Sequence, residues 1–156
     1  MALRVDGSLL AVGDDGAVVY NSDGALVQTL PGIFDQFDSS IIITDVATDG
    51  ENNFYVLPTF DQTIYKFDAN GRFLDRIGQE GEQPGDLDSA NSIAVDGQGR
   101  IFVEDFVGNL LYEANGRYQE TLAMEGAAFT LLFDSQNQLL RMNRNGNQIE
   151  RYILTR

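Results

Sequence analysis

Short apolar runs alternate with glycine-containing turns along the whole chain. Val, Ile, Leu, Phe and Tyr gather in runs such as Phe54–Val56 and Ile101–Val103, which are typical of β-strands. Eight of the 16 glycines directly follow Asp or Asn, and these dipeptides supply the positive φ values of two-residue hairpin turns. No stretch of about a dozen residues combines helical periodicity with caps. The pattern therefore predicts a succession of antiparallel hairpins.

Two markers recur along the chain and divide it into similar units. The first is an aromatic residue followed by a turn that ends in Asp-Gly or Asn-Gly, at Tyr20–Gly24, Phe67–Gly71 and Tyr112–Gly116. The second is an apolar strand that ends in Asp, at Asp6, Asp49, Asp96 and Asp134. The aromatic of the first marker recurs after 47 and then 45 residues. Internal periods of this length indicate a repeat architecture.

Each unit has room for four short strands. In the third unit these are expected at residues 92–96, 100–105, 109–113 and 117–122. The units span about residues 2–30, 42–78, 90–122 and 128–156, and the fourth lacks its outermost strand. Four antiparallel strands in roughly 40 residues make one blade of a β-propeller. The sequence predicts one all-β domain, residues 1–156, with just under four four-stranded antiparallel blades.

The strands are apolar at consecutive positions, as in Ile101–Val103. Sheets covered on both faces show this pattern, and neighbouring blades cover each other in a propeller. Because natural propellers have about four to eight blades, three arrangements remain open. The chain belongs to a larger propeller, associates with a second copy to complete a ring, or closes as a small four-bladed ring.

The most specific stretch is a glycine-spaced connector at residues 77–87, followed at residues 93–103 by an apolar strand ending in Asp, a glycine turn and a further strand. It resembles the NHL-repeat family of β-propellers, although Ala90 and Asn91 stand where that family usually has proline. The resemblance implies a toroidal propeller, most often six-bladed. It also implies a rigid platform that binds proteins or other ligands through loops at one end.

A minority of similar propellers are enzymes. The amidating lyase and the streptogramin lyase of this kind depend on His, which this chain lacks. Gluconolactonase-like propellers hold a divalent cation with Glu, Asn and Asp, and no residue-by-residue match to those ligands exists here. We therefore expect a non-enzymatic binding module with no catalytic residues. The alternative is a lactonase or hydrolase of propeller type that depends on a divalent cation.

The composition removes several other classes of function. With 24 acidic and 10 basic residues, the net charge is -14, which argues against nucleic acid as a partner. The absence of Cys and His excludes disulfides, thiolate metal sites and Ser-His-Asp catalysis. No signal peptide or membrane span is visible. The expectation is a soluble, acidic protein, cytoplasmic by default and extracytoplasmic if the chain is part of a secreted protein.

Four phenylalanines are the candidate ligand-binding residues. Phe60 and Phe106 occupy corresponding loops, between the second and third strands of successive units. Phe34 and Phe37 lie in a longer connector at residues 31–40. Loop aromatics on a rigid scaffold make good binding anchors. The alternative for all four is packing against a neighbouring blade.

Two groups of charged residues have both a functional and a plain structural interpretation. The acidic residues Asp14, Asp15, Asp45, Asp49 and Glu51 offer oxygen ligands to Ca²⁺, but Asp before Gly also simply builds turns. No metal site is assigned and no cofactor is expected, with Ca²⁺ as the alternative. The basic residues near the C-terminus form either a patch for an acidic partner or ordinary surface charge: Arg141, Arg144, Arg151 and Arg156.

Overall fold

The computed structural model describes residues 1–37, 41–144 and 147–154, which form four separate antiparallel sheets. Blade 1 contains β1 (Ala2–Leu3), β2 (Leu9–Gly13), β3 (Gly16–Tyr20) and β4 (Leu26–Pro31). Blade 2 contains β5 (Ile43–Thr48), β6 (Phe54–Pro58), β7 (Ile64–Phe67) and β8 (Phe73–Ile77). Blade 3 contains β9 (Ser92–Val95), β10 (Ile101–Asp105), β11 (Gly108–Tyr112) and β12 (Tyr118–Leu122). Blade 4 contains β13 (Ala128–Phe133), β14 (Leu139–Asn143) and β15 (Gln148–Tyr152).

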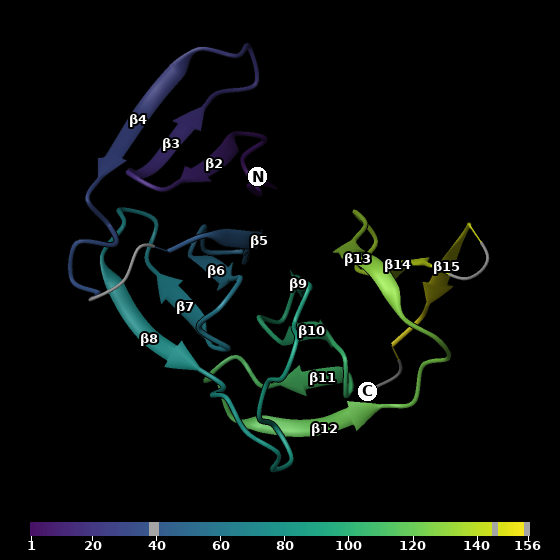
Figure 1. Cartoon of the computed structure of the whole chain (residues 1–156). Helices are drawn as coiled ribbons and strands as arrows, with labels where there is room; N and C mark the ends of the chain where they lie inside the picture. The colour runs from purple at the N-terminus through teal and green to yellow at the C-terminus, as the bar shows by residue number, and fades with distance from the viewer. Residues whose placement is uncertain (38–40, 145–146, 155–156) are drawn as a thin grey trace.

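The four blades stand side by side around a common centre, so the predicted all-β propeller architecture is confirmed (Figure 1). The first strand of each blade lies innermost, and β1 contacts β5, β5 contacts β9, and β9 contacts β13. The strands β4, β8 and β12 lie at the outside. Blade 4 has three strands among the described residues, as the repeat pattern predicts.

The blades form an open arc, so the small closed four-bladed ring, one of the three arrangements left open by the sequence, does not hold for this chain. In the described part of the chain, no strand of blade 1 contacts a strand of blade 4. Figure 1 shows the gap between β2–β4 at one end of the arc and β13–β15 at the other. Each of these end blades therefore covers only one of its two faces with a neighbour.

Apolar side chains fill the spaces between consecutive blades. Phe54 stacks on Phe67 in the core between blades 1 and 2, with ring centroids 5.0 Å apart. Phe102 and Phe133 pack edge to face at 5.1 Å between blades 3 and 4. Because a middle blade is packed on both faces, every residue of β6 and β10 is buried. This explains why those strands are apolar at consecutive positions.

The uncovered faces of the two end blades are apolar as well. On blade 1, Leu3 and Leu9 pair across β1 and β2 and point away from blade 2. On blade 4, Met142 and Ile149 pair across β14 and β15 and point away from blade 3. All four are exposed. Exposed apolar sheet faces of this kind favour association with further protein.

The recurring Asp closes the turn between the first two strands of blades 2, 3 and 4. The Asp96 carboxylate accepts hydrogen bonds from the backbone N–H groups of Gln98 and Arg100, at 2.9 and 2.8 Å. Asp49 and Asp134 accept the equivalent pairs of bonds in their own turns. Asp is favoured there because its short side chain reaches backbone donors two and four residues further along.

Blade 1 departs from this rule, and the sequence pattern places its marker two residues too late. The backbone N–H of Arg4 donates to the carbonyl of Ser8 at 2.8 Å, as Asp49 N–H donates to the carbonyl of Asn53 at 3.0 Å. Asp96 and Asp134 begin their turns in the same way. The structural counterpart of these aspartates in blade 1 is therefore Arg4 and not Asp6.

Candidate functional site

A hollow lies beside blade 2, at the end of the blade where β6 turns into β7. It has a volume of about 690 Å³, which is within the usual range for small-molecule sites. Its walls come from the β6–β7 loop, the strands β7 and β8, and the connectors on either side of blade 2. The lining residues are Phe37, Phe60, Asp61, Thr63, Tyr65, Arg76, Gly78, Gln79 and Glu80.

Three lining residues, Phe37, Tyr65 and Arg76, form a cluster that we call the floor of this hollow, in which a guanidinium group lies over two aromatic rings. The rings of Phe37 and Tyr65 lie 4.4 Å apart, centroid to centroid. Arg76 lies opposite Tyr65 in the pairing of β7 with β8, and its guanidinium is 5.3 Å from the centroid of each ring. A cation over aromatic faces is attracted by their electron-rich centres. The two tilted rings therefore help to hold the Arg76 guanidinium in place.

Polar contacts fix the remaining wall. The Tyr65 hydroxyl donates a hydrogen bond to Asp61 at 2.7 Å. Burial, and then the neighbouring Asp61 carboxylate, raise the pKa of Tyr65 to about 12, so this hydroxyl stays protonated at neutral pH. The Thr63 hydroxyl lies 3.1 Å from the carbonyl of Gly78, to which it donates. These bonds join the β6–β7 loop to the connector that follows β8.

The four predicted binding residues separate into two in the hollow and two outside it. Phe60 is 73% exposed and lines the hollow together with Phe37, which belongs to a different connector. Phe106 is 83% exposed in the β10–β11 loop but does not line the hollow. Phe34 is only 6% exposed and packs edge to face on Phe67 at 5.7 Å. Phe34 therefore has the packing role that the sequence left as its alternative.

Sequence reasoning missed Tyr65 and Arg76. Both lie in strands that the pattern predicts, but their cross-strand pairing depends on the register of β7 and β8. The bulge between Lys66 and Phe67 shifts that register. Knowledge of the pairing alone would have placed the two residues on one face of the blade.

The acidic residues do not gather into a cation site. Among the described residues, no group of three or more acidic side chains is placed to hold a metal ion. The Asp45 carboxylate instead joins blades 2 and 3, because it accepts hydrogen bonds from the Ser92 hydroxyl at 2.7 Å and the Ile93 N–H at 3.0 Å. The Asp49 carboxylate accepts bonds from Asn53 and from the Tyr55 hydroxyl, at 2.9 and 3.1 Å.

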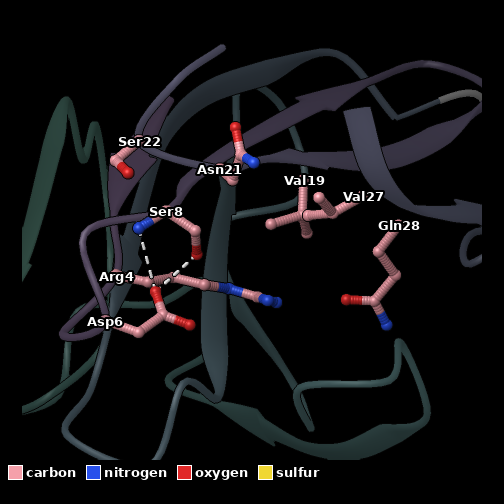
Figure 2. A pocket seen from close by; sticks show the side chains of 8 residues that line it. All are labelled: Arg4, Asp6, Ser8, Val19, Asn21, Ser22, Val27 and Gln28. Atoms are coloured by element: carbon pink, nitrogen blue, oxygen red, sulfur yellow. Dashed lines mark hydrogen bonds between the residues drawn. The ribbon is translucent and has the colours of Figure 1, made fainter. Parts of the chain in front are cut away.

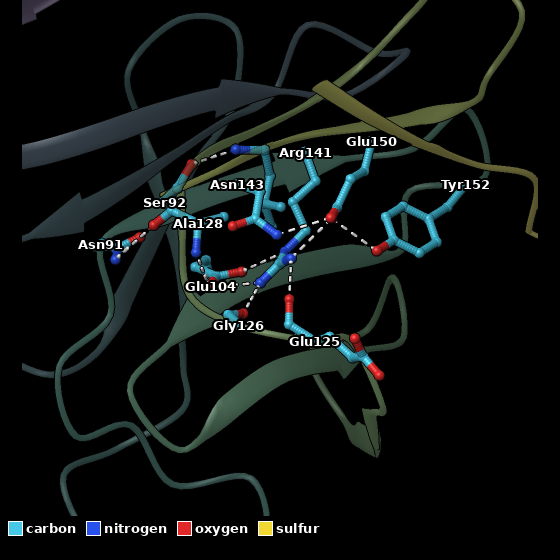
Figure 3. A network of polar contacts seen from close by, with 11 residues as sticks. Asn91, Ser92, Glu104, Glu125, Gly126, Ala128, Arg141, Asn143, Glu150 and Tyr152 are labelled. Atoms are coloured by element: carbon cyan, nitrogen blue, oxygen red, sulfur yellow. Dashed lines mark hydrogen bonds and ion pairs between the residues drawn. The ribbon is translucent and has the colours of Figure 1, made fainter. Parts of the chain in front are cut away.

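Arg141 does not belong to a surface patch, contrary to both interpretations of the C-terminal arginines. Its side chain is fully buried between blades 3 and 4 (Figure 3). The guanidinium pairs with Glu104 at 3.3 Å and Glu150 at 3.0 Å, and it also donates to the carbonyls of Glu125 and Gly126. Arg156 lies outside the described residues. Arg141 therefore cannot contribute to a basic surface patch near the C-terminus.

The two carboxylates that pair with Arg141 also accept hydrogen bonds from other groups. Glu104 accepts a hydrogen bond from the backbone N–H of Ala128 at 2.6 Å. Glu150 accepts bonds from Asn143 at 2.8 Å and from the Tyr152 hydroxyl at 2.9 Å. These bonds, led by that from Asn143, lower the pKa of Glu150 below its ordinary value. Because each charged group of this network already has partners within the protein, the network serves to join blades 3 and 4 and does not need a ligand.

A family comparison matches this architecture over most of the chain. The sequence profile of the family DUF5128, described as "6-bladed beta-propeller", matches residues 39–153. The chain belongs to this 6-bladed beta-propeller family. None of the curated proteins compared with it matches by sequence. In the described part of the chain, no helix is long and apolar enough to cross a membrane.

Solved structures share the fold of this 6-bladed beta-propeller chain at low identity. A protein of unknown function from Bacteroides caccae has a TM-score of 0.57 and 17% identity over 96% of the chain. The corresponding values are 0.61, 15% and 98% for streptogramin B lyase. They are 0.59, 16% and 94% for a protein of unknown function from Bacteroides thetaiotaomicron VPI-5482. The chain spans 58%, 53% and 38% of these three proteins, respectively.

Proposed function

We propose that this chain is part of an NHL-like β-propeller that binds a protein or another ligand, without catalysis, through the hollow beside blade 2. The observation that supports the proposal is the exposed Phe60, which lines the hollow together with the floor residues Phe37, Tyr65 and Arg76. Aromatic and Arg side chains carry a large share of the energy in protein interfaces. A ligand that inserts an apolar or planar group would bury Phe60 and stack against this floor.

The rigidity of the surroundings supports a binding role. Two of the floor residues, Tyr65 and Arg76, lie opposite each other on paired strands, and the bond between Tyr65 and Asp61 ties β7 to the β6–β7 loop. A surface that is already ordered loses little conformational entropy when a ligand binds, so more of the contact energy becomes affinity. Polar groups around the rim, including Gln79 and Glu80, would give the ligand its orientation.

The hydrolase alternative has less support. Its cation would need several converging oxygen ligands, and among the described residues no three carboxylates are placed together to supply them. The likeness to streptogramin B lyase, at 15% identity, extends to the fold alone. An increase in melting temperature with excess Ca²⁺, Mg²⁺ or Mn²⁺ would favour this alternative over the binding role, because a ligand that binds only the folded state stabilises it.

A peptide-display selection against the chain, followed by affinity measurements on variants, tests the proposal. We expect the selected peptides to bind Phe60→Ser at least tenfold more weakly than the parent chain, a loss of about 1.4 kcal/mol or more. Phe106→Ser is the matched control, because this equally exposed phenylalanine lies outside the hollow. Equal affinity for the parent chain and Phe60→Ser would reject the hollow as the binding site.

A further inference from the structure

A second pocket lies on blade 1, at the opposite end of the blades. It has a volume of about 360 Å³. Its walls come from the β1–β2 turn, the β3–β4 turn and the strands β3 and β4. The lining residues are Arg4, Asp6, Ser8, Val19, Asn21, Ser22, Val27 and Gln28. The β6–β7 loop of the first hollow lies at the other end of the sheets, so the two sites are separate.

Arg4 is the unusual residue of this pocket, because it reverses the charge of a repeated position. Asp49, Asp96 and Asp134 occupy the corresponding places in the other blades, where each accepts backbone hydrogen bonds of its own turn. In blade 1 that role passes to Asp6, which accepts bonds from the Ser8 N–H at 2.9 Å and the Ser8 hydroxyl at 2.6 Å. The guanidinium of Arg4 therefore does not take part in closing this turn.

The guanidinium is buried and lacks an ionic partner. Arg4 is only 6% exposed. Among the described residues it donates one hydrogen bond, to the carbonyl of Ala69 at 3.3 Å, and its Nε atom has no partner there. No carboxylate of the described residues lies within ion-pairing distance of it. Burial lowers the pKa of Arg4, an effect that the charge of Asp6 only offsets in part.

Such a group is costly unless something pairs with it. A buried charge without a partner destabilises a folded protein, and native proteins rarely retain one without a reason. Figure 2 shows the Arg4 side chain extending into the space between Ser8 on one side and Gln28 on the other. The side chains of Asn21 and Ser22 lie above it in this view, and the Asn21 side-chain oxygen accepts the backbone N–H groups of Asp23 and Ala25. The geometry suits a small anion that approaches Arg4 through this opening.

The charges around the pocket select the kind of anion. Arg4 is the one cationic side chain in the lining, and the Asp6 carboxylate is also part of the wall. A phosphate dianion would bring two negative charges close to one cation, Arg4, and one carboxylate, Asp6, so Arg4 could balance only one of them. A carboxylate brings a single charge and matches the planar donors of a guanidinium. The neutral Ser22, Asn21 and Gln28 would bind hydroxyl or amide groups of the same molecule.

We propose that the pocket around Arg4 binds a small molecule bearing a carboxylate and a neighbouring hydroxyl group. The carboxylate pairs with the guanidinium of Arg4, and the hydroxyl lies among Asn21, Ser22 and Gln28. This site is independent of the proposed binding hollow at the other end of blade 2.

Nuclear magnetic resonance of the arginine Nε–H groups in the parent chain tests this proposal directly. The probes are glycolate, which carries a carboxylate and a hydroxyl, and glycolamide, its neutral counterpart. We expect glycolate to shift the Arg4 Nε–H resonance saturably and to bind at least tenfold more tightly than glycolamide. We expect inorganic phosphate to bind more weakly than glycolate. Because this readout needs no substitution, it does not depend on whether an Arg4 variant folds.

Two variants extend the test. Arg4→Met should lower glycolate affinity at least tenfold, whereas Arg151→Met, which changes an exposed arginine on β15 outside both pockets, should leave it unchanged. The proposal is overturned if glycolate produces no saturable shift at Arg4, or if glycolamide binds equally well. Tighter binding of phosphate than of glycolate would overturn the carboxylate assignment. None of these outcomes depends on Phe60, so the proposed function stands or fails separately.

Discussion

The Nε atom of Arg141 lies 3.3 Å from a carboxylate oxygen of Glu104, and both side chains are almost completely removed from water. Arg141 belongs to β14 and Glu104 to β10, so the pair joins blade 4 to blade 3. Glu104 also accepts the backbone N–H of Ala128 at the start of β13. The attachment of the last blade therefore depends on a charged contact as well as on apolar packing.

We expect Arg141→Met to lower the free energy of unfolding by about 3–5 kcal/mol, because it leaves the buried Glu104 without its counter-charge. Urea denaturation followed by circular dichroism measures this change. Arg151→Met is the matched control, since Arg151 is exposed on the neighbouring strand β15 and should change the value by less than about 0.5 kcal/mol. Equal effects of the two substitutions would show that the buried pair does not attach blade 4.

The turn aspartates give a second prediction. Asp96→Ala should lower the free energy of unfolding by about 1–3 kcal/mol, because the N–H groups of Gln98 and Arg100 lose their acceptor. Asp23→Ala serves as the control, because Asp23 is an exposed turn residue of blade 1. Urea denaturation of both variants measures the difference. A loss at position 96 no larger than at position 23 would contradict the proposed role of the repeated Asp.

The lowered pKa of Glu150 predicts that the free energy of unfolding depends on pH. Its hydrogen bonds, first that from Asn143, hold its pKa in the folded state below the ordinary value of 4.5. A carboxylate with a lowered folded-state pKa stabilises the protein above its unfolded-state pKa, and this contribution is lost as the pH falls through the folded-state pKa. The stability difference between the parent chain and Glu150→Gln should therefore be greatest above about pH 4.5 and shrink below it. A difference that is constant between neutral pH and pH 3, measured by urea denaturation, would contradict this assignment.

The uncovered faces of the end blades predict association of the isolated chain. Leu9 on blade 1 and Met142 on blade 4 lie on apolar sheet faces that no other blade covers. Light scattering should give a mass that rises above 17.2 kDa as the concentration increases. The double variant Leu9→Lys, Met142→Lys should shift the mass towards that of the monomer. A parent chain that remains monomeric at every concentration would show that these faces do not drive association.

Part of the candidate site could be predicted from the sequence, and part could not. The loop position of Phe60 predicts an exposed aromatic, and the structure places it at the rim of a hollow. The same reasoning applied to Phe34 does not separate a binding residue from a core residue, because both occur in connectors. The outcome depends on which side of the connector faces blade 2, where Phe34 meets Phe67.

The sequence by itself determined most strands, the turns of blades 2 to 4 and the number of blades in this chain, because hairpins form between neighbouring segments and their residues obey local rules. Only the tertiary structure decided that Arg141 is buried and that Arg4, not Asp6, corresponds to the turn aspartates. The burial of Arg141 depends on contacts between blades, which join residues far apart in the chain, and the place of Arg4 depends on which backbone groups pair in the β1–β2 turn. The local pattern around a charged residue carries no information about the carboxylate, carbonyl or open pocket that another blade places beside it.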